Sequence, residues 1–424
     1  MKRLSQAFFR GINSCCLGIA AFVLVFSLNA SAQHEQAPRA DSTTQIEATE
    51  VHEGDAANAH EEEGQKGGRF DPTDMILNHI ANSNEFHLWG HVAVPLPCIL
   101  YSKEDGFTNF FSSKLHHGEK AFNRYVLDHG VVRRVLDPSF PSAEVEVGHV
   151  RHEKVAGGEI GYLTFEGKEY QLEKATTLLA GTSFYDFSIS KNVFSMLLSG
   201  LLLLWIFISV SRKYKKRGNV APKGLQNFME IMVQFIIDEV AKPMLGKNYQ
   251  RFLPFILTIF FFILVNNFLG LIPIFPGGAN ITGNLSTTLT LALFTFFITL
   301  FNSKSYYWQH ILWMPGVPVP MKLFLAPIEI MGIFIKPISL MIRLFANITA
   351  GHIIILSLVG LIFVFGNAGE SLGGGIGGAL VAIPFTLFMN VIEIIVGLIQ
   401  AFIFAILSAS YFGAALEEGH GEHH

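Results

Sequence analysis

Ionisable side chains lie within apolar sequence near the end of the chain, at Glu329, Lys336, Arg343, His352 and Glu393. The sequence around them is apolar enough to lie in a membrane. A charged side chain at mid-bilayer costs about 2.5–3.5 kcal/mol even on the lenient insertion scale, so such residues usually mark an ion path or a paired site. This set of side chains therefore contains the first candidates for chemistry.

Their spacing predicts which of them share a helix face. Glu329, Lys336 and Arg343 are separated by sevens and form one stripe on a helix, and Asn347 continues the stripe one turn on. His352 lies nine residues beyond Arg343, about half a turn away at 3.6 residues per turn. We therefore expect Arg343 and His352 to contact different neighbours.

A second stripe is expected on the last apolar segment, where Glu393 and Gln400 again share a face by seven-residue spacing. Arginine stays protonated in proteins, so Arg343 is a permanent electrostatic barrier. A buried glutamate and a histidine can both exchange protons near neutral pH. The combination suits a proton route with a charged barrier.

A structural interpretation remains open at this point. Arg343 and Glu393 would then form an internal ion pair that holds two helices together, and Glu329 with Lys336 would form a salt bridge near the cytoplasmic interface.

The composition supports a membrane location. The chain has 424 residues, of which 50% are hydrophobic and only 15% charged, with a mean hydropathy of +0.40. A soluble domain carries roughly 25% charge. The net charge of -4 lacks the basic excess of a nucleic-acid binder, so no nucleic-acid partner is expected. Three cysteines exclude a disulfide scaffold, and no cofactor or metal site is predicted.

The first 32 residues are typical of a secretory signal peptide. Lys2 and Arg3 give a basic start, an apolar stretch runs from Leu17 to Leu28, and Ala30 to Ala32 suits a small-residue cleavage site. The alternative is an uncleaved transmembrane helix, but the stretch is shorter than the roughly 20 residues of a span. Either interpretation places the next segment outside the cytoplasmic membrane.

Two polar regions follow. Residues 33–69 are acidic and rich in histidine and small residues, and we expect them to be disordered. Residues 70–190 are predicted to form a periplasmic α+β module, with a short helix opening at Pro72, a strand over Phe86–Val92 and a small hairpin around Tyr162–Phe165.

Residues 191–416 form the predicted membrane core, with five spans after the leader. The first, Val193–Val210, ends in a basic cluster that belongs on the cytoplasmic side. Phe252–Ser303 contains no Asp, Glu, Lys or Arg and divides into two spans at an external turn. Leu325–Phe365 and Ala379–Leu416 are longer than a perpendicular span and should tilt.

The remaining segments of this core lie in or near the cytoplasm. Pro222–Gly246 has apolar residues at helical spacing and is predicted to be an amphipathic surface helix. Residues 417–424 form a predicted cytoplasmic tail. The fold class is thus an all-α polytopic membrane protein with a small external N-terminal module.

Three motifs in this core, in this order along the chain, resemble subunit a of F-type ATP synthases. They are Asn266–Pro273, similar to the family's third-helix ending; Ser339–Ile348 followed by Ala350–His352, similar to its arginine signature; and Gln400–Phe404, similar to its last-helix motif. Met341 stands where a small residue is usual. The resemblance covers roughly Ser188–Tyr411 and leaves the exported front end without an assigned role.

This resemblance implies a function in proton translocation, with two half-channels. Arg343 would be the essential stator arginine facing a ring of c subunits, with Gln400 near it and Asn347 on the same face. His352 and Glu393 stand where several relatives have a glutamate and a histidine, so they would act as one unit in the half-channel open to the outside.

The resemblance also implies where the protein works and with what. The last two helices would form a tilted hairpin against the c-ring, and Glu329 and Lys336 would belong to a cytoplasmic-side path or interface. The partners would be the c-ring, the b-subunit peripheral stalk, the other synthase subunits and the lipid bilayer of a bacterial inner membrane. No catalysis is expected in this chain.

A secondary transporter is the alternative class. It would explain charges inside the membrane, but it should show an internally repeated set of broken helices. No repeat relates the two halves of this sequence.

Overall fold

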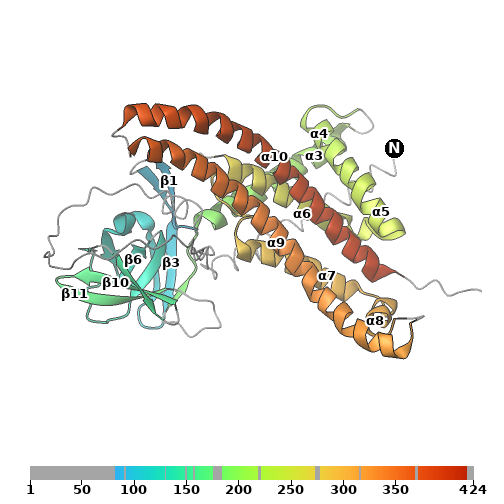
Figure 1. Ribbon diagram of the computed structural model, residues 1–424, viewed down its shortest axis with the longest axis horizontal. Helices are drawn as coiled ribbons and strands as arrows, with labels where there is room; N and C mark the ends of the chain where they lie inside the picture. Colours follow the sequence, from blue (N-terminus) through green and yellow to red (C-terminus); the bar gives the residue numbers. More distant parts are fainter. Residues whose placement is uncertain are drawn as a thin grey trace, which may run out of the picture.

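The computed structural model describes most of the chain beyond residue 81. The described residues are 82–89, 92–128, 130–148, 150–155, 158–174, 184–217, 221–272, 277–314, 317–367 and 371–417. The predicted signal peptide, the acidic segment 33–69, the helix expected at Pro72 and most of the tail lie outside them. The described residues form a β module followed by a bundle of long helices (Figure 1).

The β module consists of three antiparallel sheets. Its strands are β1 Glu85–Trp89, β2 Val92–Pro95, β3 Pro97–Ser102, β4 Gly106–Phe111, β5 Lys120–Phe122, β6 Tyr125–Asp128, β7 Val131–Val135, β8 Val145–Glu146, β9 Val150–Val155, β10 Gly158–Phe165, β11 Lys168–Lys174 and β12 Phe184–Asp186. A 3-10 helix, Ser112–Gly118, follows β4. The strand orders are β1-β2, β8-β5-β6-β7-β11-β10-β9 and β12-β3-β4.

The strands that the sequence predicts are present in the module. The hairpin expected around Tyr162–Phe165 is β10–β11, and its turn residues Glu166 and Gly167 have φ of 48° and 76°, as a tight two-residue hairpin turn requires. The strand expected over Phe86–Val92 is instead two short paired strands, β1 and β2.

The three-stranded sheet packs one face against the seven-stranded sheet. Cys98 and Leu100 alternate with outward residues along β3, and they join Tyr125, Leu127 and Val132 of β6 and β7 in one buried cluster. Burial raises the pKa of the Cys98 thiol to about 12. The opposite face of the three-stranded sheet is not part of this core.

Backbone hydrogen bonds join the module to the first membrane helix. The amides of Phe187 and Ile189 donate to the carbonyls of Ile99 and Pro97 at 2.8 and 3.1 Å, so the chain after β12 continues beside β3. The amide of Lys191, the first residue of α3, donates to the Ser83 carbonyl at 2.8 Å. The sheet is therefore fixed close to the start of the bundle.

The bundle contains helices of three kinds. They are α3 Lys191–Arg217, α4 Leu225–Ile236, α5 Lys242–Leu245, α6 Tyr249–Leu271, α7 Leu285–Asn302, α8 Ser305–Leu312, α9 Val319–Phe365 and α10 Leu372–Leu416, with a π-helix at Ile237–Ala241 and a 3-10 helix at Gly246–Asn248. Among the described residues, five segments are long and apolar enough to cross a membrane, which confirms the number predicted after the leader: α3, α4 to α6 taken together, α7, α9 and α10.

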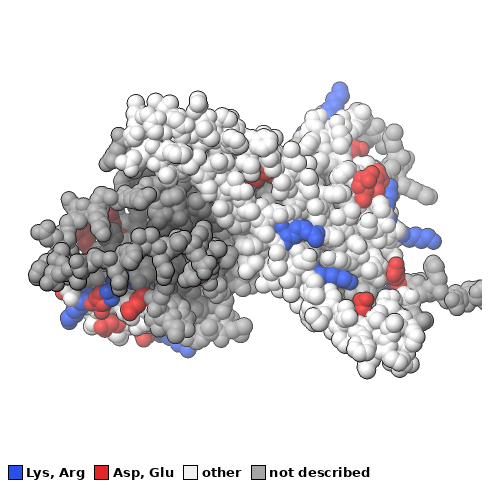
Figure 2. Space-filling model, viewed as in Figure 1, with Lys and Arg blue, Asp and Glu red and all other residues white. Residues whose placement is uncertain are grey.

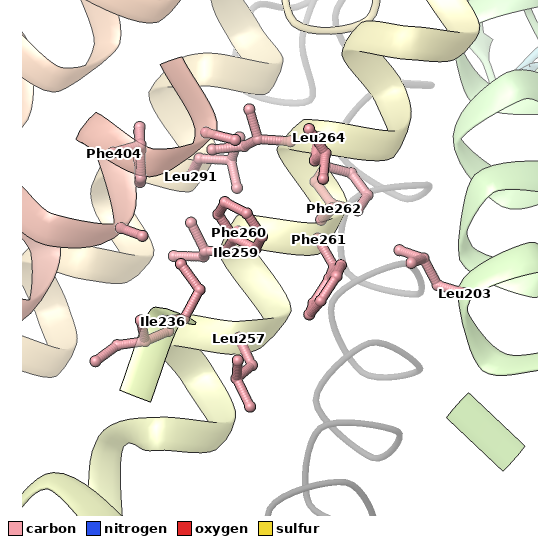
Figure 3. Close-up of a cluster of buried hydrophobic side chains, with 14 of the residues drawn as sticks. Leu203, Ile236, Leu257, Ile259, Phe260, Phe261, Phe262, Leu264, Leu291 and Phe404 are labelled. Atoms are coloured by element: carbon pink, nitrogen blue, oxygen red, sulfur yellow. The ribbon is translucent and has the colours of Figure 1, made fainter. Parts of the chain in front are cut away.

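Helix α6 lies at the centre of the bundle because it is apolar on all sides. Figure 3 shows Phe260, Phe261 and Phe262 of α6 pointing in different directions among side chains of other helices, including Leu203 of α3 and Phe404 of α10. By contrast α4 buries one face, through Met229, Val233 and Ile236, and leaves the other exposed. That agrees with its predicted amphipathic character.

Helices α9 and α10 form the long hairpin that the sequence predicts, and they lie side by side along their length (Figure 1). At 1.5 Å per residue, the 47 residues of α9 extend about 70 Å, more than twice the roughly 30 Å of a hydrocarbon core. Such a length fits a membrane only by tilt or by lying partly along its surface.

Both helices begin earlier than predicted. Helix α9 begins at Val319 rather than Leu325, and α10 at Leu372 rather than Ala379, so Gly373 to Gly375 lie in a helix and not in the expected loop. Ser371 explains the second difference, because its hydroxyl accepts a hydrogen bond from the Gly374 amide and caps α10. In apolar surroundings a helix also satisfies backbone groups that a loop would leave unpaired.

Candidate functional site

His352 of α9 and Glu393 of α10 form the shortest polar contact between the two helices. Nδ1 of His352 lies 2.6 Å from Oε1 of Glu393, and the side chains are only 12% and 4% exposed. Gly351 makes this approach feasible, since a Cβ there would lie 2.9 Å from Glu393 Oε1. The structure thus brings together the acid and the imidazole that the sequence paired.

The second carboxylate oxygen of this pair is open to a further contact. Glu393 Oε2 is buried and accepts no hydrogen bond from the described residues. A buried carboxylate oxygen without a donor is costly, so this position suits a water molecule or a proton in transit. The pair therefore has one carboxylate oxygen in contact with the imidazole and one without a donor among the described residues.

Asn347 and Gln400 form a second contact between the same helices. Nδ2 of Asn347 donates to Oε1 of Gln400 at 2.8 Å. Gln400 is buried, whereas Asn347 is exposed on the outer face of α9. Glu393 and Gln400 both point toward α9, as their seven-residue spacing predicts.

Arg343 has no acidic partner in the described part of the chain. Glu393, its partner in the structural interpretation, bonds to His352 instead. Arg343 is partly exposed on α9 and lies near enough to Tyr411 of α10 for its charge to act on the phenol. Figure 2 shows basic side chains over α9 and α10 on a broad face that otherwise carries little charge.

Lys336 and Glu329 lie further along the stripe toward the start of α9. Nζ of Lys336 lies 5.7 Å from the centre of the Tyr411 ring, within the range of a cation–π contact. Lys336 also lines a pocket with Thr299, Tyr307 and Tyr411. Glu329 acts electrostatically on Tyr307, and it does not pair with Lys336 among the described residues. Lys336 therefore lines this pocket, and Glu329 acts on Tyr307, one of the other residues that line it.

A polar layer that the spacing argument missed lies about one helical turn from His352 and Glu393, at Thr349 of α9 and Gly397 of α10. Asn267 of α6 donates to the Gly397 carbonyl of α10 at 3.0 Å and accepts from Thr282 at 2.7 Å. Thr349 of α9 donates to the Gly283 carbonyl at 3.3 Å. These residues are uncharged, so a search for ionisable groups passes over them. Asparagine and threonine within the charge-free segment were the available signal.

The fold and these contacts define the class of protein as a multi-pass membrane protein. One of its helical hairpins carries an ionisable pair and Arg343, which has no acidic partner among the described residues, as an ion-conducting subunit requires. The ATP synthase A chain family matches residues 193–413, about half of the chain. The chain belongs to this family, subunit a of the F-type ATP synthase. A domain of unknown function (DUF8433) matches residues 75–155 within the β module.

Named relatives agree with this family. The chain is 43% identical over 245 residues to ATP synthase subunit a of Chloroherpeton thalassium, and the aligned region covers 56% of this chain and 70% of the relative. It is 39% identical over 304 residues to that of Pelodictyon phaeoclathratiforme, covering 68% and 85%. ATP synthase subunit a 2 of Chlorobaculum tepidum is 45% identical over 237 residues, covering 54% and 64%.

The family fixes the general role. Subunit a is the proton-translocating subunit in the membrane sector of the synthase and associates with other synthase subunits. The secondary transporter considered from the sequence has no support.

Proposed function

We propose that this chain conducts protons between two half-channels and couples their flow to rotation of a c-ring, with Arg343 as the barrier between the half-channels. The observation that supports this best is that one hairpin carries both a contacting acid–imidazole pair and an arginine without an acidic partner among the described residues. The only acid within reach of His352 is bonded to it, and the nearby Arg343 has no acid of its own among the described residues.

In this proposal a proton enters from the outside and reaches the His352–Glu393 pair. It moves from water to the pair and from the pair to an ionised carboxylate on the ring, which becomes neutral. A neutral carboxylic acid can face lipid, whereas an anion cannot do so cheaply. After nearly a full revolution the ring carboxylate releases the proton on the cytoplasmic side.

Arg343 acts by charge alone, since it stays protonated. It attracts each ionised ring carboxylate as that group returns and repels protons that would pass directly between the half-channels. Asn347 and Gln400 fix, through their hydrogen bond, the packing of α9 on α10 beside Arg343. The driving force is sufficient, at roughly 2.3 kcal/mol per charge for each 100 mV.

The cytoplasmic half of the route is assigned to Glu329 and Lys336. Lys336 lines a pocket with Thr299, Tyr307 and Tyr411, and Glu329, nearer the start of α9, acts electrostatically on Tyr307. This placement supports an exit path or an interface there.

The proposal includes the topology and the partners. The chain lies in the bacterial inner membrane with its N-terminus in the periplasm and its C-terminus in the cytoplasm. Residues 1–32 are a signal peptide, 33–69 an acidic, histidine-rich segment, 70–190 a periplasmic module, 191–416 the membrane core and 417–424 a tail. The c-ring and the b-subunit stalk are the direct partners, and ATP chemistry belongs to other subunits, so this chain is not a catalyst.

The test is Arg343→Ala in the whole synthase, assayed for ATP-driven proton uptake into inverted vesicles by quenching of a pH-sensitive dye. Loss of the barrier should abolish coupled uptake. Ile342→Ala is the matched control, because Ile342 is the exposed apolar neighbour on the same helix. Normal uptake in Arg343→Ala would refute the assignment.

A further inference from the structure

We propose that the β module is seated on the outer leaflet of the membrane through the uncovered face of its three-stranded sheet, with lipid as the occupant of that face. The proposal goes beyond proton conduction. It requires that α3 spans the membrane, and it does not require any role of the residues in the α9–α10 hairpin.

The uncovered face is aromatic and uncharged. Along β3, β4 and β12 every second side chain points away from the core of the module, and cross-strand pairing aligns them. The outward set on the strands consists of Pro97, Ile99, Tyr101, Phe107, Asn109, Phe111 and Tyr185. Tyr101 lies 4.8 Å from Phe107 and 6.4 Å from Tyr185 between ring centres, so the rings form a continuous row.

These side chains are exposed to a degree that apolar residues on a soluble domain rarely show together. Phe107 is 76% exposed and Phe111 57%, and Phe187, next to β12, is 36% exposed. Contiguous exposed apolar patches mark protein or membrane interaction sites. Aromatic residues in particular are enriched at membrane–water interfaces.

The position of the sheet selects lipid as the occupant. The opposite face of the sheet packs on β6 and β7. The aromatic face is therefore turned away from this core, and in Figure 1 β3 lies on the side of the module nearer the helices.

Continuity with α3 gives a second reason. Only four residues separate β12 from Lys191, and the amides of Phe187 and Ile189 bond to β3. At about 3.3 Å per extended residue, Phe187 lies within about 13 Å of the start of α3. Helix α3 itself exposes Leu201 and Trp205, which face lipid if α3 spans the membrane. The Pro97–Phe111 end of the aromatic face thus lies next to the start of a helix with a lipid-facing surface.

The experiment is photo-crosslinking in the whole synthase, reconstituted in vesicles of phosphatidylcholine and phosphatidylglycerol. Phe107 and Phe111 are replaced one at a time by p-benzoylphenylalanine, which retains the aromatic ring and reacts with adjacent C–H bonds on illumination. Lys168, exposed at the tip of the β10–β11 hairpin, is the control position. Mass spectrometry identifies each adduct.

We expect phospholipid adducts at both phenylalanine positions at a yield several-fold above that at Lys168. An adduct mainly with another synthase subunit would overturn the proposal in favour of a protein partner. A yield equal to that at Lys168 would overturn it in favour of water. Because no ATP or proton flow is needed, the result is independent of the test on Arg343.

A second variant checks that the aromatic side chains cause the contact. With p-benzoylphenylalanine at Asn109, between the two phenylalanines on β4, Phe107→Asp with Phe111→Asp should lower the lipid adduct to the level of Lys168. Unchanged lipid adducts in that variant would show that the module lies on the membrane for another reason and would overturn the proposed role of this face.

Discussion

Arginine side chains have opposite surroundings in the two parts of this molecule. In the β module, Arg134 is only 2% exposed and its guanidinium contacts Asp105 at 2.6 Å and Glu104 at 2.8 Å, and Arg124 contacts the same two carboxylates. In the bundle, Arg343 has no carboxylate partner among the described residues, although it lies in far more apolar sequence.

The difference separates structural charges from functional ones. An arginine that a fold uses for stability is supplied with acids by that fold, as in the module. An arginine retained in the membrane without one is costly to the isolated chain. The proposed function accounts for this cost, because in it the carboxylate comes from a moving partner and a fixed acid would compete with that partner.

The largest effect is expected from giving Arg343 a fixed acid. In Asn347→Asp the new carboxylate lies one helical turn away, at the spacing that favours an ion pair. It should compete with the ring carboxylate and lower ATP-driven proton uptake by several hundredfold, since a pair 4 Å apart at an effective dielectric of 20 reaches about 4 kcal/mol and each 1.4 kcal/mol is a factor of ten.

Asn347→Leu is the matched control. It removes the same amide donor to Gln400 at similar size, without adding charge. Equal proton uptake in the two variants would mean that the acid does not matter and that Arg343 is not kept free for the ring.

The second prediction concerns the charges that are paired in the bundle. His352→Ala and Glu393→Gln should each lower proton uptake, by roughly a hundredfold at the lower end of what positioned proton-transfer groups contribute. The exchange His352→Glu with Glu393→His should recover much of the loss, because it retains an acid and an imidazole in contact. Dye-quenching rates measured at several pH values provide the readout.

That exchange has an outcome that contradicts the argument. If the double variant is no better than either single variant, the pair is not one interchangeable proton-transfer unit. Western blotting of the assembled synthase separates such a result from loss of the subunit.

Much of this comparison could be predicted from the sequence because membrane helices follow local rules. Apolar length predicted the five spans, and seven-residue spacing predicted that Glu393 and Gln400 share a face, which the structure shows to be the face toward α9. The spacing did not show that Glu393 would contact His352 rather than Arg343, because that contact depends on the register between α9 and α10. The roles of these residues stay predictions.

The β module was less predictable for a physical reason. Its sheets depend on pairs far apart in sequence, such as Tyr185 with Tyr101 and Leu172 with Val135. Alternation within one short strand does not specify which strand lies beside it. The hairpin β10–β11 was found because a tight turn makes its pairing local.

A smaller effect is expected in the module itself. Arg134→Met removes the hydrogen bonds to Asp105 and Glu104. Loss of the bond to Asp105 alone should lower the local free energy of unfolding by about 1.5 kcal/mol, the low end for a hydrogen bond to a charged group, since the carboxylate reaches solvent. Hydrogen–deuterium exchange of β7 amides in the whole synthase measures this. Proton uptake should be unchanged, and a loss of uptake comparable to that in Arg343→Ala would erase the distinction between the two arginines.

The smallest predicted effect is a pH dependence confined to the module. Hydrogen bonds from Arg124 and Arg134 lower the pKa of the Glu104 carboxyl from its usual 4.5. A carboxyl whose folded pKa is lowered stabilises the fold fully above its unfolded pKa and loses that contribution as the pH falls through the folded value. Exchange of β6 and β7 amides should therefore become faster, relative to the intrinsic rate, as the pH falls below about 4.5. Glu104→Gln should flatten this dependence, and an unaltered profile in that variant would assign the acid sensitivity to other carboxyls of the module.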